Sequence, residues 1–276
     1  MKRLSIAFVL MFFSFFILTT SVIAGAVKDQ VIAENEMLGD KNAELLFKYA
    51  MYKIQAELAC DALEAVMNVP IGLSQLLHEI GEANEVFIKY ALNAAKSGDM
   101  TSSIDISLDA IKINRVFLKD AQEVRELYAT GKKEAPYESN YYSAMNIAEI
   151  EVDSSGIPEA LIKENKKLRE TNRILVRRCN FARDSINDLR DYTYKSIRMT
   201  LVTLDATINN SEKSIELLSE AINQMKGDKL KESIILIQAV FVINSYAKDL
   251  GIEAKKSDLS FQKNIQDMIK SINSII

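Results

Sequence analysis

Apolar residues recur at spacings of three and four along most of the chain, which is the spacing of one face of an α-helix. Between Glu34 and Met67 they are Leu38, Leu45, Leu46, Tyr49, Tyr52, Ile54, Leu58, Leu63 and Val66. The pattern predicts a long amphipathic helix that ends before Pro70, because a residue that precedes proline is pushed away from the helical conformation. A second helix is predicted from there to about Lys96, with Gly98 as its stop.

Three further helical stretches follow. One runs from about Ser102 to Thr130 and is ended by Gly131 and Pro136. Residues 159–226 contain neither glycine nor proline. They favour one helix, about 100 Å long at 1.5 Å per residue; the alternative is a turn at Asn209-Asn210-Ser211, with Ser211 as N-cap. After the Gly227 turn, a helix is expected from Lys229 to Leu250 with Gly251 as its cap, and a last helix from Ser257 or Asp258.

The long stretch carries a heptad pattern. Leucine or alanine recurs every seventh residue, and the second apolar position of the repeat holds asparagine twice: Leu161, Leu168, Leu175, Ala182 and Leu189, with Asn165, Asn172, Cys179 and Ile186. Such seams pair helices in coiled coils, and a buried asparagine fixes their register. The predicted fold is all-α: an elongated helical bundle of long antiparallel helices with coiled-coil-like heptad seams, following an N-terminal signal peptide.

Two segments of the chain resemble each other. The sequence Ala91-Leu92-Asn93 through Lys96-Ser97-Gly98-Asp99 is similar to Ala221-Ile222-Asn223 through Lys226-Gly227-Asp228, and an apolar helix follows each. The likeness suggests two related hairpins, one in each half of the chain. The alternative is that such residues are simply a common way to end one helix and begin the next.

The first residues have the layout of a secretion signal. Lys2 and Arg3 precede an uncharged apolar run, and Ala24 and Ala26 offer small residues for signal cleavage. The alternative is an uncleaved anchor, since the run is long enough to span a bilayer. We therefore expect an extracytoplasmic protein, periplasmic or secreted, that is membrane-anchored if the N-terminal segment is kept. The apolar stretch 234–243 is short and predicts a buried helix.

These boundaries predict four parts of the chain. They are a signal peptide (1–26), N-terminal helical hairpins (27–136), an irregular tyrosine-rich connector (137–157) and a long coiled-coil-like helix plus C-terminal helices (158–276) that packs with the N-terminal half. Only 9 Gly and 3 Pro occur in 276 residues, too few for the frequent turns of a β-sandwich. The formal net charge of −4, or −6 once Lys2 and Arg3 leave with the signal, argues against a nucleic-acid partner.

Candidate chemistry is sparse. His78 and Glu82 lie one helical turn apart and are the only metal-ligand candidates, but carboxylate-bridged metal bundles use a histidine from each of two helices, and this chain has 1 His. A solvated acidic face is the favoured interpretation of that segment. We predict no catalytic or cofactor-binding residue, because no known metal, phosphate or nucleophile motif is present. Cys60 and Cys179 either form a disulfide or remain two buried thiols, and the sequence favours neither.

A surface for partners is predicted from the charged and aromatic residues Lys166, Arg169, Arg173, Arg177, Tyr137, Tyr141 and Tyr142. The alternative for the basic residues is a solvated helix exterior with pairs one turn apart. We expect a non-enzymatic scaffold, adaptor or sensor that binds itself or another envelope protein through helical surfaces, with no cofactor. Two alternatives are a membrane-active, pore-forming type of bundle that inserts 234–243, and a metal or small-ligand carrier.

Overall fold

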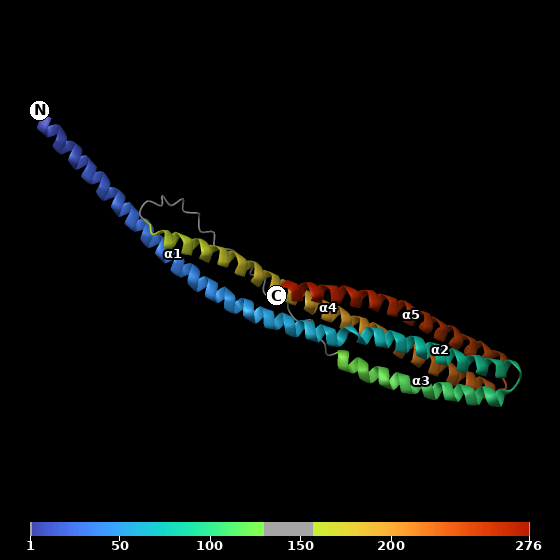
Figure 1. Ribbon diagram of the computed structural model, residues 1–276. Helices are drawn as coiled ribbons and strands as arrows, with labels where there is room; N and C mark the ends of the chain where they lie inside the picture. Colours follow the sequence, from blue (N-terminus) through green and yellow to red (C-terminus); the bar gives the residue numbers. More distant parts are fainter. Residues whose placement is uncertain (1, 130–156, 276) are drawn as a thin grey trace. The chain divides into compact units, whose positions relative to one another are not determined.

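The computed structural model describes residues 2–129 and 157–275, and all the regular structure in these residues is α-helical (Figure 1). The helices are α1 (Lys2–Met67), α2 (Val69–Lys96), α3 (Met100–Ala129), α4 (Glu159–Lys226) and α5 (Leu230–Ile275). The all-α prediction is confirmed, and so is the single uninterrupted helix over 159–226. Nearly all of the predicted connector lies outside the described residues.

Two predicted helix boundaries differ from the structure. Helix α1 begins at Lys2 and so contains the predicted signal segment; cleavage after Ala24 or Ala26 stays a prediction. Helix α5 continues through Gly251 to Ile275, so the predicted cap at Gly251 is wrong. The local rule that glycine ends helices is overridden at Gly251 by tertiary packing, which is described below.

The described residues divide into two compact units. Unit 1 holds 2–57 and 157–186, and unit 2 holds 58–129 and 187–275. Helices α1 and α4 contribute residues to both units. Each unit thus combines residues from the first and the second half of the chain. The predicted division of the chain into the parts 27–136, 137–157 and 158–276 stays a prediction.

In unit 1, helices α1 and α4 run in the same direction. Asn165 Nδ2 donates to Asn35 Oδ1 at 2.8 Å and Asn172 Nδ2 donates to Asn42 Oδ1 at 3.0 Å, each across 130 residues. A constant difference in residue number means parallel helices, so the antiparallel prediction is wrong for this pair. Short turns force neighbouring helices to be antiparallel, but the chain between α1 and α4 is long and imposes no such direction.

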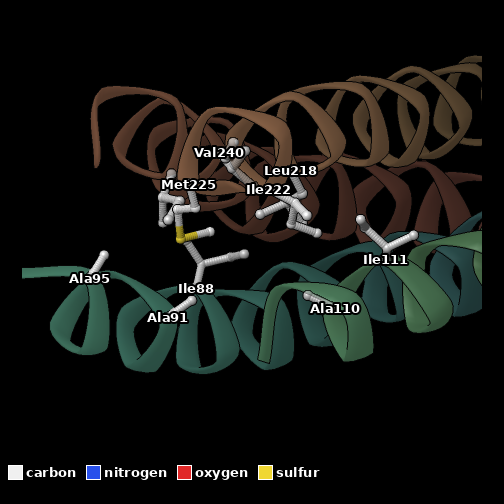
Figure 2. Close-up of a cluster of buried hydrophobic side chains, with 11 residues drawn as sticks. Ile88, Ala91, Ala95, Ala110, Ile111, Leu218, Ile222, Met225 and Val240 are labelled. Carbon is white, nitrogen blue, oxygen red and sulfur yellow. The ribbon is translucent and has the colours of Figure 1, made fainter. Parts of the chain in front are cut away.

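Unit 2 is a bundle to which α2, α3, α4 and α5 contribute. One of its core clusters draws on all four helices, and Figure 2 shows Ile88 of α2 and Met225 of α4 pointing toward one another. Its members are Ile88, Ala91, Ala95, Ala110, Ile111, Leu218, Ala221, Ile222, Met225, Ile237 and Val240. Many of these side chains are small, which lets the helices approach closely.

Helices α2 and α5 run antiparallel in unit 2. Ser74 Oγ donates to Asp258 Oδ2 at 2.6 Å, and farther along α2 Lys248 Nζ donates to Glu85 Oε2 at 2.5 Å. Residue numbers therefore rise along α2 as they fall along α5. The antiparallel prediction is confirmed for this pair and for the α2–α3 hairpin.

The two hairpin turns have the same hydrogen bonds. At the first turn Gly98 N–H donates to Ala95 O and Asp99 N–H to Ala94 O; at the second, Asp228 N–H donates to Met225 O and Lys229 N–H to Gln224 O. Each turn places a residue in the left-handed region, Gly98 with φ 84° and Asp228 with φ 60°. These bonds form a Schellman motif at the end of α2 and again at the end of α4.

Buried polar side chains repeat with the same offset as the turns. Asn114 Nδ2 donates to Asn84 Oδ1 at 3.2 Å, and Asn244 Nδ2 donates to Ser214 Oγ at 3.3 Å. The donors Asn114 and Asn244 also bond the carbonyl of the residue four before them. Adding 130 to the residue numbers of the first hairpin gives the second, as it does for the asparagine pairs of unit 1. The structure therefore supports the expectation of two related hairpins.

Candidate functional site

The two metal-ligand candidates, His78 and Glu82, lie in different surroundings. His78 Nδ1 lies 3.3 Å from the backbone oxygen of Lys248, on the side of α2 that packs against α5. Glu82 is exposed to solvent. Among the described residues, no group of three or more His, Cys, Asp or Glu side chains is arranged to hold an ion.

Both cysteines are buried thiols in the structure. The thiol of Cys179 donates to Leu45 O at 3.2 Å, and burial raises the pKa of this thiol above its ordinary value. A raised pKa keeps the group protonated and chemically inert near neutral pH. The disulfide stays a hypothesis of the sequence alone.

The predicted interaction residues of α4 have different roles. Arg169 Nε lies 2.7 Å from Glu34 Oε1, with side chains 16% and 5% exposed, and so holds α4 to α1 in unit 1. Lys166, Arg173 and Arg177 are exposed. The candidate tyrosines, Tyr137, Tyr141 and Tyr142, lie outside the described residues. Arg169 therefore forms an ion pair within the fold and is not part of an exposed basic surface.

Glycines allow α2 and α5 to touch backbone to backbone. A Cβ atom placed on Gly81 lies 2.7 Å from the Lys248 backbone nitrogen, and one placed on Gly251 lies 2.6 Å from the His78 nitrogen. Real Cβ atoms essentially never come so close. Gly251 is therefore needed for helix packing rather than for ending a helix, and the same crossing holds the backbone of His78 in contact with α5.

The outward side of α1 in unit 1 is apolar. Phe47, Met51 and Ile54, spaced by four and three residues, are 68%, 43% and 53% exposed; we call these three residues the α1 outer face. Sequence reasoning missed it by assigning Ile54 to the buried stripe. The stripe that is buried holds Leu45 and, eleven residues on, Ala56, so α1 carries apolar residues on two sides.

A groove in unit 2 lies between α4 and α5, with Leu77 of α2 also in its lining. Its volume is about 740 Å³. We call it the α4/α5 groove, and it is lined by Leu77, Ala206, Asn209, Asn210, Glu212, Lys213, Glu216, Val242, Ile243, Tyr246, Ala247 and Leu250. The α4 wall is mostly polar and the α5 wall mostly apolar.

One polar group in the groove lining lacks a partner. Asn210 is 7% exposed, and its Nδ2 donates to Asn244 Oδ1 at 3.2 Å. Its Oδ1 accepts no hydrogen bond from the residues that the structure describes. A buried amide oxygen without a donor is unfavourable by about 1–3 kcal/mol.

The equivalent positions of the first hairpin hold different residues. Subtracting 130 from Ala206, Asn210 and Ala247 gives Leu76, Ile80 and Phe117, each of which has a larger apolar side chain. Ile80 is 2% exposed and belongs to the core. At these three positions the groove lining of the second hairpin is therefore smaller or more polar than the equivalent residues of the first.

One helix, over Leu230–Ser274, is long and apolar enough to cross a membrane, in a search limited to described residues. This is weak evidence for a membrane span, because a core helix of a soluble protein passes the same test. Ile237 and Val240 of this helix are buried in the bundle core. Comparison of the chain with protein-family models, with curated protein sequences and with solved structures finds no match in any of the three.

Proposed function

We propose that this chain is an exported, non-enzymatic helical-bundle protein that works by binding other proteins, as a scaffold, adaptor or sensor of the cell envelope. The α1 outer face carries the proposal. Exposed apolar residues grouped on one surface mark interaction sites in soluble proteins. Phe47, Met51 and Ile54 lie on one side of one helix at the spacing that an apolar helix of a partner matches.

The charges beside this face suit a helical partner. Lys48 pairs with Glu44 within α1, and Lys53 with Glu57 at 4.0 Å. Because each of these lysines has a carboxylate one turn away, an approaching helix meets paired rather than single charges beside the α1 outer face. The partner in this proposal is itself or another envelope protein with an apolar helical face.

The parallel helix pair supports the same role. We infer that the heptad positions of α4 form a coiled-coil seam with α1, in which Asn42 and Asn172 set the register. Cleavage of the N-terminal segment would release the folded part outside the cytoplasm. A rigid, registered pair of helices then presents the α1 outer face in a fixed orientation.

Photo-crosslinking in the native host tests this function. A photoreactive residue at Met51 is expected to capture a protein, and the same residue at Val202, which is 65% exposed on α4, serves as the control. Phe47→Asp is expected to abolish the capture at Met51. A dimer band indicates self-association and a new heavier band an envelope partner, whereas equal yields at both positions, or none, contradict the proposal.

A membrane-active bundle is the second candidate. The apolarity of α5 supports it. Insertion of 234–243 requires that Ile237 and Val240 leave the core, where neither side chain is exposed. Leakage of dye from anionic liposomes on addition of the full chain supports this candidate, and intact liposomes remove it.

A further inference from the structure

We propose that the α4/α5 groove binds a small amphipathic amine, a molecule with an apolar body and a protonated amino group. This goes beyond the proposed function, because the groove lies in unit 2 and shares no residue with the α1 outer face. Shape, apolar lining and charge each point to this chemistry.

The size of the groove suits a small molecule. Its volume of about 740 Å³ falls within the roughly 300–1,000 Å³ of small-molecule sites. Ala247 stands where the first hairpin has Phe117, and Asn210 where it has Ile80. These smaller or more polar side chains leave more space in the groove than the larger apolar ones would.

The apolar wall leaves room for the body of a ligand. Val242 and Tyr246 on α5 are 65% and 69% exposed, one turn apart, and both line the groove. Leu77 lines it as well and is 1% exposed. Covering exposed apolar surface of this kind contributes about 25 cal/mol per Å² to binding.

The polar wall favours a cation over an anion. Lys213 Nζ lies 2.7 Å from Glu216 Oε2, so the positive charge of the lining is already matched. Glu212 adds a further carboxylate, which leaves the lining with two negative groups and one positive group. An amine can pair with Glu212 and lie against the Tyr246 ring.

Three ligands with one body test the charge preference. Naphthylethylamine, naphthylethanol and naphthylacetic acid share an apolar ring and differ in the charge at the other end. Titration calorimetry with the full chain at neutral pH is expected to give the tightest binding for the amine, at least tenfold tighter than for the acid. Amine binding absent up to about 1 mM, or acid binding that is equal or tighter, overturns the proposal.

Filling the groove tests the location. The double variant Asn210→Ile with Ala247→Phe installs the residues of the first hairpin and is expected to weaken amine binding at least tenfold. Unchanged binding in a folded double variant places the amine elsewhere and overturns the proposal.

An exposed position provides a test that does not depend on repacking the core. Val242→Lys adds a positive charge at the groove, and Ile235→Lys, at a site 64% exposed on the same helix, is the matched control. Amine binding is expected to fall at least fivefold for Val242→Lys alone. An equal effect of both substitutions, or no effect of either, contradicts a site in the groove.

Discussion

The hairpins α2–α3 and α4–α5 share their turn hydrogen bonds and their buried polar pairs, yet differ where they meet other surfaces. The shared features, such as the Asn84–Asn114 and Ser214–Asn244 bonds, fix the register of helices within the bundle. The differing features set how closely helices approach and where a groove opens. Register is thus repeated between the hairpins, whereas the surfaces available for binding are not.

The largest difference in stability between substitutions at equivalent positions is expected at the close crossing of α2 and α5. Its glycines, Gly81 and Gly251, correspond at an offset of 130 to Ser211 and Ala121. Gly251→Ala forces a Cβ to 2.6 Å from the His78 nitrogen, and overpacking against backbone destabilises by about 3 kcal/mol. Ala121→Gly at the equivalent place is expected to lose about 1 kcal/mol. Urea unfolding of both variants checks this, and equal losses contradict the need for glycine.

The next largest effect on stability is expected at the buried asparagine pair of the first hairpin. Asn114→Leu removes the partner of Asn84, whose side chain is 0% exposed, and is expected to destabilise by about 2 kcal/mol. The double variant Asn84→Leu with Asn114→Leu leaves no unpaired amide and is expected to recover part of the loss. A double-mutant cycle from thermal unfolding measures the coupling, and strictly additive losses speak against the bond.

The turns differ in the residue that takes positive φ. Asp228→Gly relieves the left-handed conformation at φ 60° and is expected to stabilise by about 1 kcal/mol. Gly98→Ala at the equivalent position, with φ 84°, is expected to destabilise by about 1 kcal/mol. Opposite shifts of melting temperature check the pair, and shifts of the same sign are incompatible with matching turns.

The smallest effect on stability is expected at the buried carboxyl group of Asp258. Burial raises the pKa of Asp258, although the hydrogen bond from Ser74 lowers it. The fold therefore binds the Asp258 proton more tightly than the unfolded chain does. The contribution of this one group to stability rises as pH falls from neutral through the raised pKa and stops rising below the ordinary aspartate value of 3.8.

Asp258→Asn tests this pH dependence. The variant is expected to be more stable than the parent at neutral pH, by less than about 1 kcal/mol, and to lose this advantage below the ordinary aspartate pKa. The equivalent position on the first hairpin holds Tyr128, and Tyr128→Phe provides a control without a titrating carboxyl group. Melting curves across the acidic range measure both, and an advantage independent of pH counts against the raised pKa.

Local sequence rules predicted the helices well but not their partners. Pro70, Gly98 and Gly227 mark helix ends because proline and left-handed residues act on the backbone nearby. Gly251 was misjudged, because its role depends on a helix far away in the sequence. The relative direction of α1 and α4 was also predicted wrongly, because a heptad pattern is compatible with parallel and antiparallel pairing alike.

The candidate surfaces were also beyond local rules. Ile54 fits an apolar stripe at helical spacing, and only the packing in unit 1 shows that its stripe faces outward. The groove depends on the small side chains of Ala206 and Ala247, which carry no chemical signal of their own. The likeness around Lys96 and Lys226 was the signal that could have found it, because extending that alignment sets Ala247 against Phe117.

Disulfide trapping between α1 and α4 tests the registered pairing of the two halves most directly. In a chain with Cys60→Ser and Cys179→Ser, the pair Asn42→Cys and Asn172→Cys replaces side chains that bond at 3.0 Å. A rapid intramolecular disulfide is expected for this pair and none for Asn42→Cys with Asn165→Cys, which is two turns, or about 10 Å, out of register. No crosslink in the first pair, or equal crosslinking in both, would contradict the registered pairing.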